Sequence, residues 1–359
     1  MVFDRHSDAE TIPVSEDTEL HGPMVTLVVT CYNQAQYVRR TLENVSRQTY
    51  GNTELIIIDD CSSDDSEQVI FEWLSTYKGN ARFLKNARNL GLSASLNRVL
   101  GEARGKYFAA IAADDFWAPE KTSEQVQLLE RTSETVAFAF SDASLMDEND
   151  NLLQCHFSEM FYNSEFNRMV CGGGESSFPD GGLEVSLLPM LLCGNFIAPM
   201  TCMCRVASLR DVGGWDTRLL IEDWDMWIRL SVVGGAVYVM KRYACYRIHA
   251  KSTSRSRAAE MRESQLMIMW KCARAGLLDG EIHIGEKRAA FRDYAMHLFR
   301  RGRGEARGVA REYAGAFPSF ASLTFCIICH VGMSWGGMMV LLRLLRRFPF
   351  VGNKVPRLE

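Results

Sequence analysis

The sequence predicts an α/β fold in which a doubly wound, mainly parallel sheet is sandwiched by helices and followed by a C-terminal helical extension. From residue 24 onward, short apolar runs alternate with helical stretches over about a hundred residues, which is typical of repeated strand–helix–strand units. Acidic residues follow several of these runs, where open α/β sheets place their ligands. The composition, 47% hydrophobic and 23% charged, is that of a globular protein, and 359 residues suffice for about two domains.

Charge and cysteine usage exclude several classes of protein. A formal net charge of −4 gives no general attraction to nucleic acid, so no nucleic-acid partner is expected. The eleven cysteines stand singly among apolar residues and no secretory signal opens the chain, which favours a cytoplasmic protein without disulfides. Residues 1–23 hold six acids, one arginine and no apolar periodicity, which predicts a disordered leader.

The first half of the predicted α/β domain, residues 24–135, contains four strands and the four helices that follow them. Apolar stripes, such as Leu96, Val99 and Leu100, indicate which side of each helix faces the sheet. The strands are expected at 25–30, 54–59, 82–85 and 107–113, and the helices at 36–48, 66–77, 93–103 and 120–131.

The second half, residues 136–254, is less regular, and residues 255–359 form the expected helical extension. The second half is expected to contain strands at 136–140, 236–240 and 243–248, a turn and hairpin at 142–154, a long loop at 157–182, a turn at 213–216 and a helix at 222–233. In the extension, 257–275 and 285–317 are expected to be largely amphipathic helices.

Polar or acidic residues follow three of the expected strands, and a parallel sheet brings such strand ends together along one edge. They are Thr30 and Tyr32, then Asp60, then Asp114 and Asp115. Two adjacent carboxylates repel each other unless a positive charge lies beside them, so the last pair favours a divalent cation. A simpler interpretation is that Asp115 or its neighbour starts the next helix, and that Asp60 opens a capped turn.

Four ordered motifs resemble the family 2 glycosyltransferases of GT-A fold over residues 24–254. They read VTLVVTCYNQAQYVRRTLENVSRQTYGNTELIIIDDCSSDDS, RNLGLSASLNRVLGEARGKYFAAIAADDFWAPEK, VGGWDTRLLIEDWDMWIRL and YRIHAKSTS. The resemblance implies that a sugar is moved from a nucleotide-diphospho-sugar to an acceptor hydroxyl with inversion, with 24–135 as the nucleotide-binding half and 136–254 as the metal and acceptor half.

The resemblance also implies the residues that bind the donor. Thr30 and Tyr32 match positions that flank the base, Asp60 matches the carboxylate that binds a uracil-like ring, and Asp114 matches a ribose contact. A carboxylate only accepts hydrogen bonds and suits the imide N–H of uracil or thymine, so a UDP or dTDP sugar is favoured. Arg88 could pair with phosphate or remain a solvated surface charge.

Asp115 matches the carboxylate that holds Mn2+ or Mg2+ in the family. Many members carry another aspartate where this chain has Ala112, so the metal would depend mainly on Asp115 and on diphosphate oxygens. His249 matches a histidine that contacts the metal or diphosphate in some members, or is an ordinary surface histidine. Such a cation would stabilise the charge that develops on the departing nucleoside diphosphate.

Asp223 matches the general base of the family. Such a base is needed because an acceptor hydroxyl is too weakly acidic to attack unaided. The alternative role of Asp223 is to cap the helix at 222–233. Glu222 and Trp215 are expected on the acceptor side, although the turn that contains Trp215 could be purely structural.

Residues 313–342 contain no Asp, Glu, Lys or Arg, and Arg343, Arg346 and Arg347 follow at once. The alternatives for 313–347 are contact with a membrane surface, a true span, and buried helices or an oligomer interface. Membrane contact would suit a lipid-linked rather than a free carbohydrate acceptor, at the inner face of the cell membrane, in surface polysaccharide or glycolipid assembly.

Two other functions remain open at this stage. A nucleotide-sugar-binding protein without turnover would explain Ala112, and a sugar nucleotidyltransferase would use a similar cleft. A dehydrogenase is disfavoured because the first strand lacks a glycine-rich phosphate turn.

Overall fold

The computed structural model describes residues 22–154, 183–185, 187–249, 257–279, 284–301 and 305–316. Residues 1–21 of the expected leader, the expected loop at 157–182 and most of the apolar segment 313–347 lie outside the described residues. The chain forms two compact units, each made of several segments. The first unit contains Met1–Ser186, Phe196–Gly214 and Leu230–Arg247, and the second contains Leu187–Asn195, Trp215–Arg229 and Ile248–Glu359.

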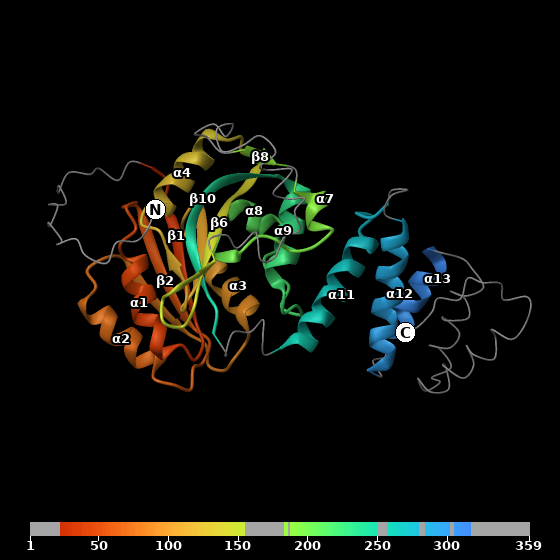
Figure 1. Ribbon diagram of the computed structural model, residues 1–359, viewed down its shortest axis with the longest axis horizontal. Coiled ribbons are helices and arrows are strands. Elements are labelled where there is room, and N and C mark those ends of the chain that lie inside the picture. The colour runs from red at the N-terminus through yellow and green to blue at the C-terminus, as the bar shows by residue number, and fades with distance from the viewer. Residues whose placement is uncertain are drawn as a thin grey trace, which may run out of the picture. The chain divides into compact units, whose positions relative to one another are not determined.

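The first unit is built on a ten-stranded sheet, whose first four strands are parallel in the order β3-β2-β1-β4. Strands β1 and β2 are mostly apolar and almost entirely buried, as expected of strands covered on both faces. Helices α1 to α4 connect or follow these strands (Figure 1). The bounds are Val25–Cys31 (β1), Ala35–Val45 (α1), Thr53–Asp59 (β2), Ser66–Thr76 (α2), Ala81–Lys85 (β3), Leu92–Glu102 (α3), Tyr107–Ala112 (β4) and Lys121–Arg131 (α4).

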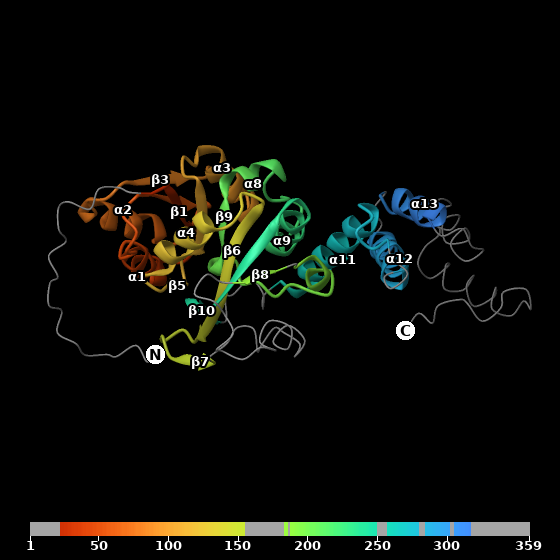
Figure 2. The ribbon, with the colours of Figure 1, turned by 90° about the horizontal axis from the view of Figure 1, so that it is seen from above.

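The sheet continues beyond β4 with mixed strand directions, in the order β9-β6-β10-β5 (Figure 2). Strand β9 runs antiparallel to both β4 and β6, whereas β6 and β10 are parallel. The bounds are Phe116–Trp117 (β5), Val136–Met146 (β6), Leu152–Gln154 (β7), Leu183–Val185 (β8), Met203–Arg205 (β9) and Gly235–Arg247 (β10). The sheet is therefore mainly parallel in its first half and mixed in its second.

Two expectations for the second half differ from the structure. Strand β6 does not end at residue 140 but continues to Met146, and all eleven of its residues are buried, so the hairpin with β7 begins later. The separate strands expected at 236–240 and 243–248 form one strand, β10. Its pairing with β6 shifts between Val239 and Ala244, so irregular pairing absorbs the polar Lys241–Arg242 interruption that suggested a break.

A glycine turn follows α8 (Val206–Asp211), as the sequence predicts. Gly213 and Gly214 have φ values of 82° and 71°, in the left-handed region that favours glycine. A Cβ on Gly214 would lie 2.3 Å from Oδ1 of Asn97, so a side chain at this position would require the Asn97 amide to move as well as a strained backbone.

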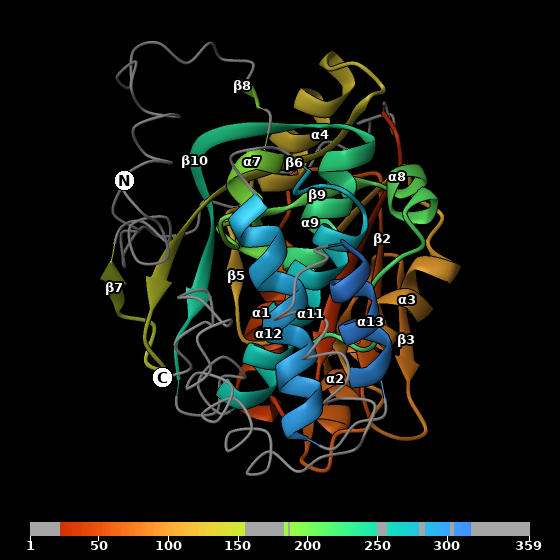
Figure 3. The ribbon, with the colours of Figure 1, turned by 90° about the vertical axis from the view of Figure 1, so that its right-hand side faces the viewer.

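The second unit is helical and contains α7 (Leu188–Leu191), α11 (Ala258–Arg274), α12 (Ile284–Arg300) and α13 (Ala306–Ala316). Helix α9 (Glu222–Val233) begins in this unit and ends in the first. Figure 3 shows α11, α12 and α13 side by side. No helix within the described residues is long and apolar enough to cross a membrane.

Helix α11 is bound to the segment that leads into α9. The Lys271 ammonium donates to Asp216 Oδ2 at 2.9 Å and also to Asp225 Oδ1, and the backbone N–H of Leu220 donates to Ser264 Oγ at 2.8 Å. Helix α11 thus supports the start of α9. The second compact unit contains both residues 215–229 and the residues after 247.

Candidate functional site

The strand order reverses between β1 and β4, and this is the place where open α/β sheets bind ligands. Thr30 pairs with Ala112 in the adjacent strands, and the backbone N–H of Ala113 donates to the Thr30 carbonyl at 2.9 Å. Tyr32 follows β1 directly and is 48% exposed. The sheet therefore brings the residues after β1 and the Asp114–Asp115 pair to one edge, as the sequence predicts.

Asp60 fixes the loop that precedes α3. Its Oδ1 accepts hydrogen bonds from Asn86 Nδ2 at 2.7 Å and from the Leu90 N–H at 2.8 Å, and its Oδ2 accepts from the Gly91 N–H at 2.8 Å. The side chain is 6% exposed. A carboxylate has about four acceptor positions, so three are used within the protein and one remains for a ligand N–H. The sequence did not reveal this loop-fixing role.

The sequence also allowed Asp60 to open a capped turn before α2. In the structure it is Asp64, just before α2, whose carboxylate accepts the N–H groups of Ala35 and Ser66, at 3.0 Å each. The Asp60 carboxylate instead binds the loop at residues 86–91. Arg88 lies exposed on that loop.

Asp115 is almost inaccessible, with 3% of its surface exposed. Its Oδ1 accepts the backbone N–H of Arg247 at 2.9 Å, while Oδ2 of the neighbouring Asp114 accepts Nε2 of Gln34 at 3.1 Å. Burial and the Asp114 charge raise the pKa of Asp115 well above its usual value, and the Arg247 N–H and charge only partly oppose this. The ionised form of Asp115 therefore needs further positive charge.

Arg247 connects this acidic pair to the turn between β6 and β7. Its guanidinium donates to the Asp114 carbonyl at 2.8 Å, to the Asp147 carbonyl at 2.9 Å and to the Asp150 carboxylate. The side chain is fully buried, with its guanidinium carbon 4.8 Å from the Tyr37 ring centroid. The sequence marked Arg247 only as part of the motif that ends in His249, because these partners are about a hundred or more residues away.

The second acidic pair, Glu222 and Asp223, opens α9 in the second unit. Asn195 Nδ2 donates to Asp223 Oδ2 at 2.8 Å, and Trp224 Nε1 donates to the Leu191 carbonyl at 2.7 Å. Burial raises the pKa of both acids. The negative charge of Asp223 adds to this effect and raises the pKa of Glu222 to about 8, whereas the Asn195 hydrogen bond opposes the rise at Asp223.

These shifts make the two acids chemically different at neutral pH. Glu222 keeps its proton more readily than an ordinary glutamate, whereas the Asn195 hydrogen bond favours the ionised form of Asp223. Among the described residues, no Lys or Arg forms an ion pair with Asp223, and a carboxylate in such surroundings is suited to accept a proton. The sequence missed Asn195, which carried no motif and lies 28 residues before its partner.

Trp215 and His249, the other residues expected at the site, both lie in the second unit and are 7% and 6% exposed. Neither is thus an ordinary surface side chain.

Within the described residues, no three His, Cys, Asp or Glu side chains are grouped as a metal site. Asp115 would consequently hold a cation only together with ligands from elsewhere, such as diphosphate oxygens or water.

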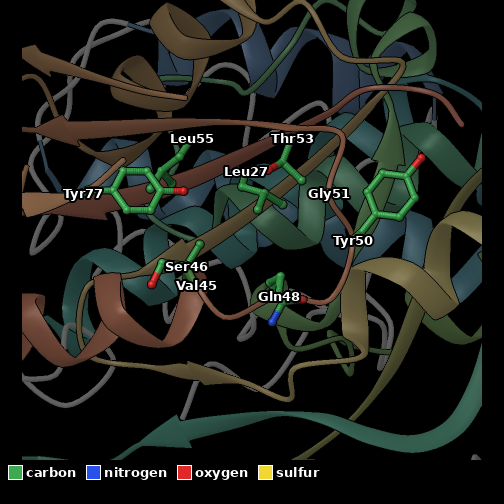
Figure 4. A pocket seen from close by; sticks show the side chains of 9 residues that line it. All are labelled: Leu27, Val45, Ser46, Gln48, Tyr50, Gly51, Thr53, Leu55 and Tyr77. Carbon is green, nitrogen blue, oxygen red and sulfur yellow. The ribbon is translucent and has the colours of Figure 1, made fainter. Parts of the chain in front are cut away.

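A cavity of about 150 Å³ lies elsewhere in the first unit (Figure 4). Leu27, Thr53 and Leu55 contribute to it from the amino-terminal parts of β1 and β2, far along the strands from Thr30 and Asp60. No charged side chain lines it. The cavity therefore lacks the groups that a diphosphate would require, and it contains none of the expected site residues.

Residues 26–183 match the model of the family described as "Glycosyl transferase family 2". An uncharacterized glycosyltransferase of Rickettsia prowazekii is 24% identical over 245 residues, covering 68% of this chain and 70% of that protein. An uncharacterized glycosyltransferase of Methanocaldococcus jannaschii is 33% identical over 138 residues, covering 38% of this chain and 47% of that protein.

Two solved structures are similar in fold. A mannosyltransferase of Pyrobaculum calidifontis, in complex with GDP-Man and Mn2+, has a TM-score of 0.52 at 16% identity, covering 91% of this chain and 83% of that chain. S. aureus TarS 1–349, in complex with UDP-GlcNAc, has a TM-score of 0.54 at 16% identity, covering 85% and 79%. This likeness confirms the predicted α/β fold of GT-A type.

Proposed function

Because the chain belongs to the family 2 glycosyltransferases and is an enzyme of glycosyl transfer, we propose that it moves a sugar from a nucleotide-diphospho-sugar to an acceptor hydroxyl with inversion, assisted by Mn2+ or Mg2+. One observation carries this proposal. The strand order reverses between β1 and β4, and that edge presents Thr30, Tyr32 and the Asp114–Asp115 pair together. Asp60, at the end of the neighbouring strand, adds an acceptor for a base.

The nucleoside would lie on the loop that Asp60 organises. The remaining acceptor position of Asp60 suits an N–H of uracil or thymine, and Tyr32 is exposed enough to pack against the base. In this proposal Thr30 borders the base, Asp114 binds the ribose and Arg88 pairs with phosphate. Guanine also presents an N–H edge, so a GDP-sugar is the competing donor.

The buried Asp115 fits a divalent cation, because a hard carboxylate oxygen with a raised pKa gains from a neighbouring positive charge. When bound, such an ion would stabilise the negative charge of the departing nucleoside diphosphate. The Arg247 N–H holds Oδ1 of Asp115 in a fixed orientation. His249 is the second residue that we propose for the metal or diphosphate.

Asp223 would accept the proton of the acceptor hydroxyl while Glu222 stays protonated beside it. The bond between the anomeric carbon and the diphosphate oxygen breaks as the bond to the acceptor oxygen forms, and the proton passes to Asp223. We assign Glu222 and Trp215 to the acceptor side, where a neutral carboxylic acid can donate a hydrogen bond to a sugar.

A nucleotide screen tests the donor and the metal together. Binding of UDP, dTDP and GDP is measured by thermal shift with and without Mn2+, for the natural chain and for Asp115→Asn. We expect a rise in Tm for a uridine or thymidine nucleotide that needs both Mn2+ and Asp115. Metal-independent binding of every nucleotide would contradict the proposed site.

Product analysis separates this function from its two competitors. A glycosyltransferase incubated with its donor and Mn2+ releases nucleoside diphosphate, whereas a nucleotidyltransferase releases or consumes pyrophosphate. A protein that binds nucleotide sugars without turnover releases neither, even with a panel of carbohydrate and lipid-linked acceptors.

We also propose that a lipid-linked acceptor is used at the inner face of the cell membrane, in surface polysaccharide or glycolipid assembly. The support is the uncharged stretch at 313–342 and the arginines that follow it. Flotation with anionic vesicles, compared with neutral ones, tests this. The triple variant Arg343→Ser, Arg346→Ser, Arg347→Ser should lose binding to the anionic vesicles, and equal flotation of both proteins would refute the membrane contact.

A further inference from the structure

Among the described residues, the amide of Asn195 is a polar group that contacts Asp223 from outside its own helix. Its Nδ2 lies 2.8 Å from Asp223 Oδ2, although the two residues are 28 positions apart in the sequence. Asn195 ends the segment Leu187–Asn195, and that segment makes a second contact with the start of α9. The Trp224 indole N–H donates to the Leu191 carbonyl at 2.7 Å, where both residues are buried.

The two contacts fix different parts of the same helical turn. The indole contact holds the helix against the Leu187–Asn195 segment, and the amide contact then sets the direction of the neighbouring carboxylate. A carboxylate at the first turn of a helix otherwise rotates between several staggered orientations. With Oδ2 held by Asn195, the other oxygen has a defined position.

The charges around Asp223 explain why an amide matters here. Glu222 is the adjacent acid on α9, and the Leu187–Asn195 segment contributes no Asp, Glu, Lys or Arg. Helix α11 contributes Lys271, but its ammonium binds Asp216 and Asp225. An amide donor favours the ionised carboxylate without the stronger suppression of basicity that an adjacent cation causes.

On this geometry, and given the proposed function, we propose that Asn195 is a positioning residue that holds Asp223 ionised and oriented for removal of the acceptor proton. Asn195 need not touch the substrate. It acts through Asp223, so its loss should change the pH dependence of transfer more than the binding of the donor.

Two variants separate the hydrogen bond from the shape of the side chain. Asn195→Asp has the same shape but exchanges the N–H donor for a negative charge, and Asn195→Leu is similar in size but has no polar group. The rate kcat/KM is measured from pH 5 to pH 10, with donor binding by thermal shift as the second readout. Cys193→Ser, an exposed position on the same segment, is the matched control.

For Asn195→Asp we expect at least a tenfold loss of kcat/KM at pH 7. The acid limb of the plot of kcat/KM against pH should move upward by one pH unit or more, and kcat/KM should recover toward pH 9. Asn195→Leu should shift the limb less, since no charge is added, and should lower the rate across the whole range. Donor binding should stay within a factor of about three in both. If Asn195→Leu does not fold, the isosteric Asn195→Asp decides alone.

An unshifted acid limb in Asn195→Asp, with only a lower Tm, would overturn the inference and leave a structural role. Failure of the proposed function looks different. If the proposed function is wrong, Asp223→Asn would retain turnover. If Asp223→Asn is inactive but the acid limb of the kcat/KM profile of Asn195→Asp is not shifted, only the positioning role of Asn195 is refuted.

Discussion

The two pairs of adjacent acids, Asp114–Asp115 and Glu222–Asp223, each contain two carboxyl groups but differ in the residues that surround them. In the first pair, Asp115 lies beside the buried Arg247, whose backbone binds its Oδ1 and whose guanidinium binds the Asp114 carbonyl. In the second pair, the described partner of Asp223 is the neutral amide of Asn195. Burial disfavours the charged forms of Asp115, Glu222 and Asp223, and so raises the pKa of each.

The difference teaches how two similar pairs come to serve different chemistry. A buried acid held by a backbone N–H in a rigid frame is suited to a fixed cation, since its position changes little and its charge needs compensation. An acid beside a protonated neighbour and an amide is suited to taking up a proton, because no cation competes for its lone pairs. The comparison therefore predicts that the same substitution has different consequences in the two pairs.

Replacing each charged acid by its amide should give the largest effects. Asp115→Asn should abolish metal-dependent donor binding and turnover together. Asp223→Asn should lower kcat by about 10²- to 10⁴-fold, because the base is lost, while metal-dependent binding of the nucleotide is kept. Turnover and Mn2+-dependent thermal shift, measured on both variants, check this. If Asp223→Asn loses nucleotide binding as completely as Asp115→Asn, the two acidic pairs do not have different roles.

Removing the Arg247 side chain tests whether the first pair depends on a rigid frame. Arg247→Met removes the buried donor of the Asp114 and Asp147 carbonyls. The Asp150 carboxylate also loses this partner, but it is more exposed and keeps Arg40. We expect the free energy of unfolding to fall by about 3 kcal/mol or more. Denaturant unfolding measures the loss.

The control for Arg247 is Arg40, which also binds Asp150 but is 59% exposed. Arg40→Met should cost less than about 1 kcal/mol, because an exposed ion pair is screened by water. Equal losses in the two variants would mean that burial of Arg247 contributes nothing special.

The second pair predicts a pH dependence of stability. The pKa of Glu222 is raised from 4.5 to about 8, so between these values the folded chain keeps a proton that the unfolded chain releases. The contribution of Glu222 to the free energy of unfolding therefore falls as pH rises through this window. Glu222→Gln removes the penalty and should be more stable than the natural chain at pH 9, by roughly 1–3 kcal/mol.

Unfolding of both proteins at pH 4.5 and pH 9 measures this difference. At pH 4.5 the advantage of Glu222→Gln should disappear, since Glu222 is then protonated in the folded state. A constant difference between the two proteins at both pH values would contradict the raised pKa of Glu222.

The sequence predicted the parts of this molecule that depend on local pattern. The apolar runs of β1, β2 and β4 and the stripe on α3 fixed their places, and the acids after the strands marked the edge where the strand order reverses. Strands β5 and β9 escaped prediction because they have two and three residues and exist only through their pairing with β10, β4 and β6.

The supporting residues could not be predicted for a related reason. Arg247 and Asn195 act on partners 133 and 28 residues away, and no spacing in the sequence connects them. Asp60 was assigned to a nucleotide base, yet the loop at residues 86–91 that it binds became visible only when β2 and β3 were placed side by side. Sequence patterns locate acids; long-range contacts decide how each acid behaves.

The smallest expected effect concerns Lys271, which binds two other aspartates of the second unit and not Asp223. Its ammonium binds Asp216 and Asp225, and together with Arg218 it holds the pKa of Asp216 below its usual value. Lys271→Met should lower the free energy of unfolding by about 1 kcal/mol at pH 7, because two ion pairs are lost and the Lys271 side chain is only 25% exposed.

The loss in Lys271→Met should shrink as pH falls below about 4, since a lowered folded-state pKa gives stability that acid removes. The acid limb of kcat/KM should stay where it is in the natural chain, because Lys271 binds Asp225 and not Asp223. A shift of that limb as large as in Asn195→Asp would show that Asp223 responds to any nearby charge. In that case the amide of Asn195 would no longer distinguish the second acidic pair from the first.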